Sequence, residues 1–280
     1  MRARRALVWV AGWVGLALIA IYLVFHFYGK VHGLEFLTCY LIEWSLSVDN
    51  LFVFLMIFKA FGVDGRRQRR VLNWGIACAV VFRLLFILLG VALVNLFEPI
   101  MYLFGAILVY SAIQMAFGKD ESVDVTENVI VKYVRRHVPM THNFEGTAFF
   151  VRKGAGFIAT PMLLVLVAVE VSDVVFAVDS VPAAFAITRN PYIIFAANIL
   201  AILGLRSLYF MLASAEERFW MLKYGVALVL LFIGLKMLVA HWFKVSGEVS
   251  LIVVVGTLFL ALLLSYLIPK PGDAGSSESK

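Results

Sequence analysis

The sequence predicts an all-α fold: a polytopic helical membrane protein with about eight spans, arranged as two inverted three-helix repeats with peripheral first and last helices. Three observations lead to this prediction. Apolar residues make up 63% of the 280 residues and charged residues 15%, whereas soluble domains average about 45–50% and about 25%. Eight apolar runs are each long enough to cross a bilayer. An acidic motif also occurs twice, in the second run and in the fifth.

The eight runs define the expected spans, because a transmembrane helix needs about 20 mostly apolar residues. They cover residues 7–28, 36–58, 71–94, 99–117, 157–185, 191–213, 219–241 and 249–268. These runs are too long and too uniformly apolar for barrel strands, so we expect helices. The first run follows a basic N-terminus, as in a signal peptide, but no small-x-small cleavage site follows it. We therefore expect it to be retained as a span.

The Lys and Arg residues predict the orientation. If the N-terminus is cytoplasmic, every Lys and Arg outside the spans falls on the cytoplasmic side except Lys30, Arg189 and Lys244. Cytoplasmic loops carry such an excess, so we expect a multi-pass protein of the cytoplasmic membrane with both termini in the cytoplasm. The net charge of +6 is explained by these basic residues at the ends of the spans. It does not indicate nucleic acid as a partner, and membrane lipid is the expected surrounding.

The run boundaries divide the chain into six parts. They are a peripheral span (1–35), the first three-helix repeat (36–117), a cytoplasmic loop (118–156), the second three-helix repeat (157–241), the last span (242–268) and a Gly- and Ser-rich tail (269–280). We expect the tail to be disordered. Within the loop, residues 125–138 are compatible with a short amphipathic helix on the membrane surface, although a solvated connecting loop is the stronger expectation.

The two acidic motifs indicate an internal repeat. Glu43-x5-Asp49-Asn50 and Asp173-x5-Asp179-Ser180 lie 130 residues apart, from 43 to 173 and from 49 to 179. The runs that follow carry Asn73 with Arg83 and Asn198 with Arg206, and the next two open on Tyr102 with Gly105 and on Tyr224 with Gly225. Because each unit has three helices, an odd number, successive copies enter the membrane from opposite faces. Many transporters are built this way, with the substrate site at the repeat interface. Chance similarity between apolar helices is the alternative.

Five carboxylates lie inside spans, where each is unfavourable unless it is paired, protonated or bound to a cation. The acids are Glu43, Asp49, Glu170, Asp173 and Asp179, and the bases inside spans are Arg83, Arg206 and Lys236. If all are ionised, the acids exceed the bases by two charges. One divalent cation would neutralise that surplus, and protonation of two carboxyls would do so equally well.

We therefore expect a metal site built from the two motifs. Its candidate ligands are Glu43, Asp49, Asn50, Glu170, Asp173, Asp179 and Ser180. Helical geometry places Ser47 and Asn50 on the face of Glu43, and Ser180 on the face of Asp173. Carboxylate, amide and hydroxyl oxygens suit Mn²⁺, Mg²⁺ or Ca²⁺, whereas zinc and copper would favour His and Cys.

Pro182 offers a way to aim ligands from different helix faces at one ion. It lacks an N–H, so the carbonyl of Val178 is left free as a further oxygen, and we expect the helix to kink or unwind there. Arg83 and Arg206 are expected to steady the empty carboxylates or to release them when metal enters, although a purely structural role is equally compatible. Lys236 completes the supporting set.

These motifs resemble a known family. Glu43-x3-Ser47-x-Asp49-Asn50 and Glu170-x2-Asp173-x2-Phe176-x2-Asp179-Ser180-x-Pro182 are similar to the two signature segments of the TerC family of integral membrane proteins. Residues 150–153, 201–206 and 217–225 also resemble that family, particularly its Alx branch, and the resemblance covers roughly residues 36–240. It implies a divalent metal exporter, chiefly for Mn²⁺, in the bacterial cytoplasmic membrane, with the acids of both segments lining the metal path. Some members are linked by name to tellurium resistance.

The sequence thus predicts a secondary transporter, not an enzyme, that exports Mn²⁺ or a similar ion and holds no permanently bound cofactor. Protons are the expected counter-ion, because carboxylates must lose theirs to bind metal. Two alternatives stay open: a membrane metal sensor or scaffold that binds unidentified protein partners through 118–156, and, less favoured, an intramembrane aspartyl protease. The sequence contains no Gly-x-Gly-Asp motif, which would favour a protease. It also contains no Gly-x4-Gly-Lys-(Ser/Thr) motif, which would favour an ATP-driven pump.

Overall fold

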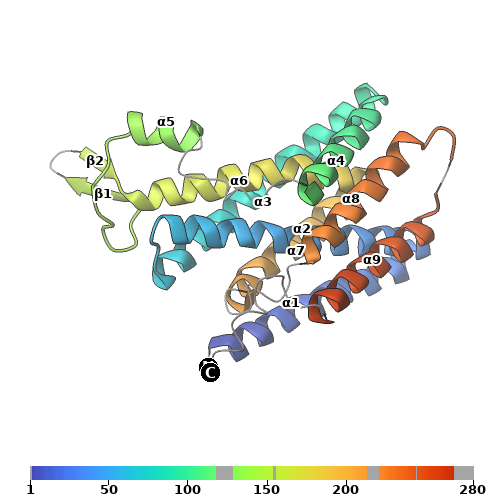
Figure 1. The fold of residues 1–280 in the computed structure, drawn as a ribbon, viewed down its shortest axis with the longest axis horizontal. Coiled ribbons are helices and arrows are strands. Elements are labelled where there is room, and N and C mark those ends of the chain that lie inside the picture. The colour runs from blue at the N-terminus through green and yellow to red at the C-terminus, as the bar shows by residue number, and fades with distance from the viewer. Residues whose placement is uncertain (1, 118–128, 154–155, 213–220, 244, 268–280) are drawn as a thin grey trace.

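The chain is a bundle of long helices in the computed structural model (Figure 1). The structure describes residues 2–117, 129–153, 156–212, 221–243 and 245–267, and within these ranges it leaves out the side chains of 2–6, 49, 52, 206–207 and 210–212. The elements are α1 (Arg2–Tyr28), α2 (Lys30–Ala60), α3 (Gly65–Leu96), α4 (Ile100–Phe117), α5 (Val129–His137), β1 (Phe150–Lys153), β2 (Gly156–Ala159), α6 (Pro161–Phe185), α7 (Pro191–Leu212), α8 (Leu222–Leu238) and α9 (Gly247–Leu267).

Eight long helices coincide with the eight predicted runs. Six of them, α1, α2, α3, α4, α6 and α9, are long and apolar enough to cross a membrane. The other two are shorter: α8 has 17 residues, and the apolar stretch of α7 is Pro191–Leu205. The polytopic helical fold is thus confirmed, while the count of eight spans stays a prediction.

Local chemistry explains where the helices start and stop. Gly29 adopts a φ of 87°, a left-handed conformation that suits glycine, and it separates α1 from α2. The carboxylate of Asp64 caps α3 by accepting hydrogen bonds of 3.0 Å from two N–H groups of the first turn. Thr160 caps α6, and Pro161 takes the first helical position. Because α2 already starts at Lys30, the domain boundary predicted after residue 35 falls inside this helix.

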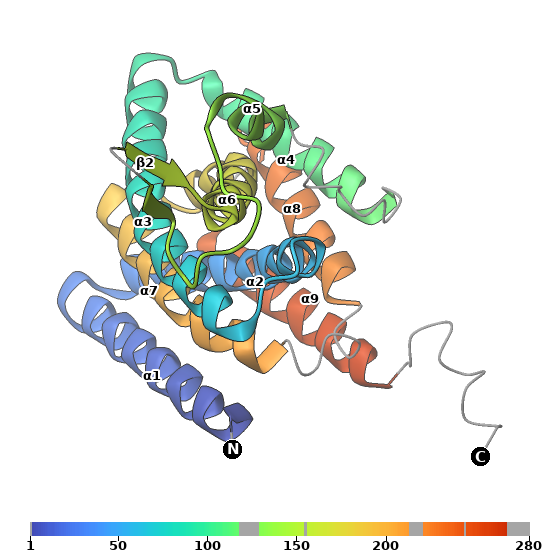
Figure 2. The ribbon, with the colours of Figure 1, turned by 90° about the vertical axis from the view of Figure 1, so that its left-hand side faces the viewer.

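Helix α2 lies at the centre of the bundle (Figure 2). Both α2 and α3 pack against α6 and α7, and α4 packs along α8, while α1 and α9 lie outside this group. Suppose that α2, α3 and α4 of the first repeat correspond to α6, α7 and α8 of the second. The contact of α2 with α7 then has an equivalent contact, that of α6 with α3, and both are present. These packing pairs are compatible with the predicted repeats, which themselves stay a prediction. The inverted axis also stays a prediction.

The α4–α8 crossing brings two glycines together. A Cβ atom on Gly105 would lie 3.0 Å from the carbonyl oxygen of Gly234, and one on Gly234 would lie 2.8 Å from the carbonyl oxygen of Gly105. Small residues permit such a close approach of two helix backbones. In the alignment of the two predicted repeats, Gly105 corresponds to Gly225 instead. Gly225, however, lies against Ala261 of α9. The structure thus gives these two glycines different neighbours.

The described residues of the segment between the two repeats include a helix and two strands. Helix α5 lies within the stretch 125–138 that was compatible with a helix. Strands β1 and β2 form an antiparallel hairpin in which Phe150 pairs with Ala159 and Lys153 with Gly156. The hairpin was not predicted, because strands of four residues give almost no periodic signal. It also crosses the boundary that was placed after residue 156, and α6 begins only at Pro161.

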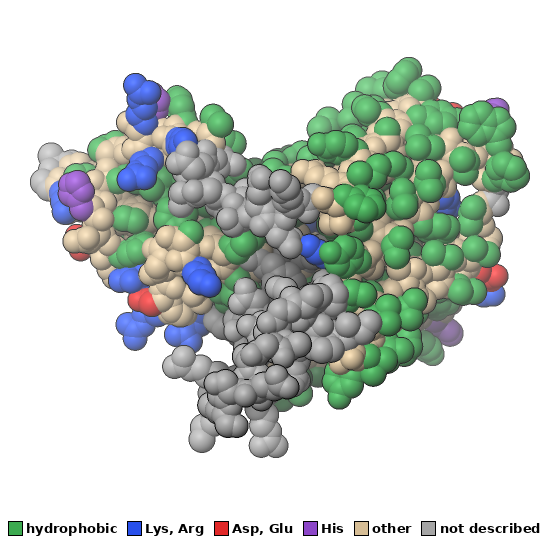
Figure 3. All heavy atoms as spheres, in the orientation of Figure 1, with side chains coloured by type: hydrophobic (Ala, Val, Ile, Leu, Met, Phe, Trp, Pro, Cys, Tyr) green, Lys and Arg blue, Asp and Glu red, His purple; other side chains and the backbone are tan. Residues whose placement is uncertain are grey.

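The loop before the hairpin is fastened to the start of α3. Arg67 donates from Nε to the carbonyl of Gly146 at 2.8 Å, and its guanidinium lies 4.6 Å from the centre of the Phe144 ring. Trp74 meets Phe149 edge-on, with ring centres 6.2 Å apart. Figure 3 shows Lys and Arg side chains gathered at this end of the molecule, while the opposite lobe presents a broad apolar surface. This polarity agrees with the orientation expected from the loop charges.

Candidate metal-binding site

A small internal cavity lies between α2, α3, α6 and α7. Its walls are Ser47, Asn50 and Phe54 of α2, Leu72, Gly75, Ile76, Ala79 and Arg83 of α3, Val169, Glu170 and Asp173 of α6, and Ile202 and Leu205 of α7. Its free volume of about 10 Å³ is close to what one water molecule needs. Helices of both predicted repeats thus face one shared space, as expected for a site at a repeat interface.

Arg83 joins the two acidic motifs at one end of this cavity. The residue is 1% exposed. Its Nη1 donates to Glu43 Oε2 at 2.9 Å and to Ser180 Oγ at 2.7 Å, and its Nη2 lies 3.6 Å from Asp173 Oδ1. The guanidinium therefore bridges α2 and α6 from its place on α3. Removing one partner of such a buried ion pair is strongly destabilising, because it leaves an uncompensated charge.

Two carboxylates that line the cavity have oxygens without a partner. Both oxygens of Glu170 and Oδ2 of Asp173 are buried and accept no hydrogen bond from the described side chains and backbone. Gly75 leaves room beside them, since a Cβ atom on Gly75 would lie 3.4 Å from Glu170 Oε1. Buried polar atoms are almost always paired in native proteins. These three oxygens therefore need a cation, a proton or water.

The structure brings seven of the predicted residues together: Arg83 and six residues that face the cavity or this arginine. Ser47 and Asn50, each 3% exposed, line the cavity on the same face of α2 as Glu43. Ser180 reaches the arginine that also holds Glu43. The six residues that face the cavity or the arginine at its edge are Glu43, Ser47, Asn50, Glu170, Asp173 and Ser180.

Other predicted residues lie elsewhere. Asp179 accepts a hydrogen bond of 2.5 Å from Ser111 Oγ of α4, away from the cavity. Lys236 donates to Ser250 Oγ at 2.8 Å, between α8 and α9. Helix geometry explains why Asp179 points away from Asp173, because the two are displaced by about 120° around α6, but it does not name Ser111 as the partner. The side chains of Asp49 and Arg206 lie outside the described part of the structure.

The unwinding expected as one outcome at Pro182 is absent, and a kink there stays a prediction. Helix α6 continues through Pro182 to Phe185, and Val178 is 47% exposed on its surface. Pro182 removes one backbone hydrogen bond only three residues before the helix ends, where few bonds remain to be lost. The missing N–H still leaves the Val178 carbonyl without its usual donor, but Val178 does not line the cavity.

Sequence reasoning overlooked the position of Asn198. Its side chain is 1% exposed, and neither its oxygen nor its nitrogen has a partner among the described residues. Asn198 precedes Ile202 and Leu205 by four and seven residues on α7, so it shares the face that lines the cavity. The signal was an isolated amide in an apolar run, which the sequence comparison used only as a repeat marker.

The acids are not gathered into one metal cage in this conformation. Within the described part of the chain, no three His, Cys, Asp or Glu side chains are close enough to hold one ion together. Arg83 instead occupies the space between Glu43 and Asp173. The arrangement can accept a cation if the arginine moves away from the acids, which would free oxygens from both motifs at once.

A helical membrane protein in which two acidic motifs meet at an internal cavity falls in the class of polytopic proteins with a polar site between helices. The chain belongs to the TerC family, whose description is "Integral membrane protein TerC family" and whose sequence model matches residues 28–272. The resemblance drawn from the motifs is thereby confirmed. No solved structure matches the chain.

Named relatives cover most of the chain. Alx of Salmonella typhi, a proposed membrane-bound redox modulator, is 44% identical over 273 residues, which cover 95% of this chain and 85% of that protein. Alx of Escherichia coli K12 is 42% identical over the same lengths. The chloroplastic thylakoid membrane protein TERC of Arabidopsis thaliana is 44% identical over 241 residues, which cover 86% of this chain and 62% of that protein.

Proposed function

We propose that this chain is a secondary transporter that exports a divalent metal ion, with Mn²⁺ the first candidate, across the bacterial inner membrane. The observation that carries the proposal is the cavity at whose end the buried Arg83 contacts acids from both motifs. We place both termini in the cytoplasm, as the loop charges favour. The chain acts as a carrier and not as an enzyme.

The ligand chemistry supports a hard divalent ion. Glu170 and Asp173 offer three buried oxygens without partners, and Ser47 and Asn50 add a hydroxyl and an amide on the facing helix. Oxygen donors of this kind suit Mn²⁺, Mg²⁺ and Ca²⁺. The metal is the cargo of this site and not a resident cofactor.

The charges around the cavity support exchange of the ion for protons. Among the described side chains around the cavity, Glu43, Glu170 and Asp173 carry three negative charges when ionised, and Arg83 carries one positive charge. One divalent ion balances the remaining two charges, and so do two protons. A cycle that alternates between these two fillings keeps the buried site neutral at each step.

Arg83 supplies the positive charge that the metal ion would otherwise provide to these acids. It holds Glu43 and approaches Asp173 in this conformation, and it must release them when the ion enters. Along α3 it lies on the outer side of Gly75 in the expected orientation. It therefore separates the cavity from the outer face, and rocking of one repeat against the other would reverse that access.

The test is Mn²⁺ flux in inverted and right-side-out vesicles that contain wild-type protein, Asp173→Asn or the control Glu98→Gln. Glu98 is an exposed acid paired with Arg189 outside the cavity. We expect flux in wild type and control and none in Asp173→Asn, with the direction fixed by the vesicle orientation. If wild type moves no Mn²⁺, Zn²⁺ or Ca²⁺ under any gradient, the transporter proposal fails and a sensor takes its place.

The other readings have less support from the site. A protease needs two carboxyls that share a proton, but Asp173 lies beside Arg83, and Asp179 pairs with Ser111. The redox role in the relatives' name would suit paired thiols, whereas Cys39 and Cys78 are both free. A metal sensor uses the same ligands as the transporter and is distinguished from it only by the flux measurement.

A further inference from the structure

We propose that His32 and Glu35, at the start of α2, form a second binding station for the same transition-metal cargo, at the opposite end of α2 from the cytoplasmic loop. The inference rests on the proposed transport function and adds a place where the ion is held after it leaves the central cavity. In the expected orientation this station lies at the outer face of the membrane.

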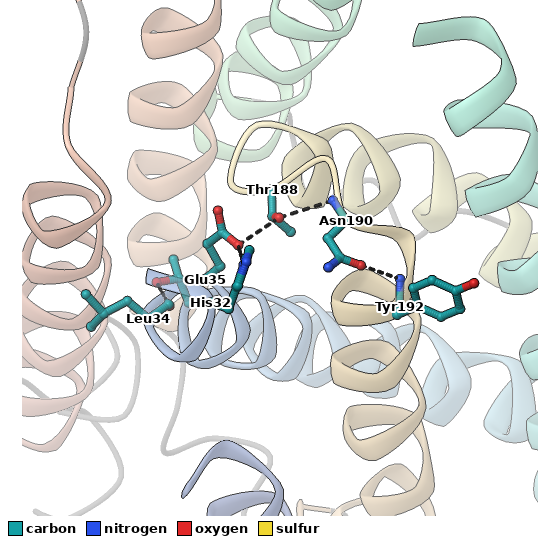
Figure 4. A network of polar contacts seen from close by, with 7 residues as sticks. His32, Leu34, Glu35, Thr188, Asn190 and Tyr192 are labelled. Atoms are coloured by element: carbon teal, nitrogen blue, oxygen red, sulfur yellow. Dashed lines mark hydrogen bonds and ion pairs between the residues drawn. The ribbon is translucent and has the colours of Figure 1, made fainter. Parts of the chain in front are cut away.

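The geometry of the pair carries the proposal (Figure 4). His32 Nδ1 lies 3.0 Å from Glu35 Oε2, and Thr188 Oγ1 donates to the same carboxylate oxygen at 3.0 Å. Thr188 is itself fixed by the N–H of Asn190, which donates to its hydroxyl at 3.2 Å. One carboxylate oxygen therefore faces a ring nitrogen from its own helix and a hydroxyl from the α6–α7 loop.

The spacing fits two neighbouring ligands of one ion. Octahedral ions of this size hold their ligands at about 2.1 Å, so adjacent ligands lie about 3.0 Å apart. The 3.0 Å separation of His32 Nδ1 and Glu35 Oε2 equals that edge. A metal ion can thus replace the hydrogen that joins the two atoms at an unchanged separation, once the ring and the carboxylate turn so that both lone pairs point at the ion. The Thr188 hydroxyl then orients the carboxylate from outside the coordination sphere.

The ligand types favour a transition metal. Imidazole suits a transition metal such as Zn²⁺, and the carboxylate also suits Mn²⁺, whereas Ca²⁺ and Mg²⁺ prefer oxygen alone. The central cavity offers oxygen ligands only, whereas this station adds an imidazole nitrogen. The two sites would therefore differ in which divalent ion they bind more tightly. The sequence reasoning missed it because it sought histidines among the acids inside the spans.

Partial exposure makes the station suitable for release. The side chains of His32 and Glu35 are 44% and 21% exposed, whereas those of Arg83 and Glu43 in the cavity are 2% and 3% exposed. Water can therefore complete the coordination of an ion at His32. Two protein ligands bind weakly, and a site on an exit path must be weak enough for the ion to leave.

The position along α2 connects the station to the cavity. Glu35 precedes Glu43 by eight residues, which is about 12 Å along a helix. Between them, Cys39 and Ile42 are buried at 1% and 2% exposure, and the cavity does not extend to Glu35. The two sites are thus separated by packed side chains in this conformation. Thr188 belongs to the second predicted repeat, and helix α2, which carries His32 and Glu35, continues into the first. The station thus connects the two units that would move.

The experiment measures Mn²⁺ binding to the purified full-length protein by the loss of the free-ion spectrum in electron paramagnetic resonance. We expect two classes of site. His32→Gln and Glu35→Gln should weaken the weaker class by more than about tenfold and leave the tighter class intact, while Asp173→Asn should do the reverse. Zn²⁺ should displace Mn²⁺ from the weaker class first, because it binds imidazole more tightly.

Matched controls exclude a general effect of changing charge or a histidine. His241 contacts Trp242 and Glu98 pairs with Arg189, so His241→Gln and Glu98→Gln should leave both classes unchanged. Unaltered weak binding in His32→Gln and Glu35→Gln, with Asp173-dependent binding and flux intact, overturns the station alone. His32-dependent binding without Asp173-dependent binding or flux overturns the transport proposal alone. No Mn²⁺ binding of either class overturns both.

Discussion

Arg83 and Glu43 form an almost fully buried ion pair, with side chains 2% and 3% exposed and Nη1 2.9 Å from Oε2. The same arginine approaches Asp173 of the second motif at 3.6 Å. One cation thus serves two helices that belong to different predicted repeats. Glu170 is left without a partner among the described residues, so the pair accounts for only part of the negative charge around the cavity.

Replacing Arg83 tests whether its charge balances the empty site. Arg83→Gln keeps a hydrogen-bonding side chain but leaves Glu43 and Asp173 uncompensated, so we expect a loss of about 3–5 kcal/mol of stability. Thermal unfolding in detergent without metal measures this loss. Mn²⁺ should raise the Tm of the variant more than that of wild type, because the ion supplies the missing charge.

The double variant Arg83→Gln/Glu43→Gln provides the control for this prediction. It removes one acid together with the base, so it should be more stable than Arg83→Gln alone. A single variant as stable as wild type in metal-free buffer would show that the guanidinium does not balance these acids.

Gly75→Ala tests the space beside Glu170. The added methyl group would lie 3.4 Å from Glu170 Oε1 and from Val169 Cγ1, an ordinary contact that should leave the fold intact. It takes volume from a cavity of about 10 Å³, so we expect Mn²⁺ binding to weaken by about tenfold. Gly256→Ala on α9 is the control, since a Cβ atom there meets nothing within 4 Å. Equal Mn²⁺ affinity in both variants would mean that the ion binds elsewhere.

Asp64 gives a pH dependence outside the membrane. The hydrogen bond from the Arg67 N–H holds the pKa of the Asp64 carboxyl below its usual value of 3.8. A lowered pKa in the folded state stabilises the fold above pH 3.8, and this contribution is lost as the pH falls through the folded-state pKa. Asp64→Asn should therefore be less stable than wild type at pH 7, and the difference should disappear in acid. Thermal unfolding from pH 7 to 3 measures it, and a constant difference would contradict the assignment.

Much of the fold could be predicted from the sequence, because long apolar runs leave few choices other than helices. The Glu43, Ser47 and Asn50 face of α2 followed from helical period alone. The hairpin of β1 (Phe150–Lys153) and β2 could not be predicted, because its strands are short. Its position also depends on contacts with the start of α3, such as that of Arg67 with Gly146.

The candidate site was harder to predict, because motifs name residues but not the direction in which their side chains point. Asp179 belongs to the same motif as Asp173, yet it faces Ser111 of α4. Arg83 was expected to steady the carboxylates, but no spacing rule showed that it reaches acids of both motifs at once. Such relations depend on how helices pack around α2, which a single sequence does not specify.

The crossing of α4 and α8 gives the last prediction. A Cβ atom on Gly234 would lie 2.8 Å from the carbonyl oxygen of Gly105 and 3.0 Å from the backbone nitrogen of Val109. Both neighbours are backbone atoms, so Gly234→Ala can be accommodated only if the helices move apart. We expect a loss of about 1–3 kcal/mol, the usual effect of overpacking, measured by thermal unfolding in detergent.

Gly204→Ala on α7 is the matched control, because its Cβ atom would lie 3.7 Å from Trp13 Cβ, an ordinary contact. It adds the same methyl group to an apolar helix, but at a place where there is room for it. It should therefore leave the Tm near that of wild type. Mn²⁺ flux adds a second measurement. If the two repeats rock about the α4–α8 crossing, Gly234→Ala should slow flux while Mn²⁺ affinity at the cavity stays unchanged, because neither glycine lines that cavity. Equal stability and flux in the two variants would place the moving contact elsewhere, for example where α2 meets α7.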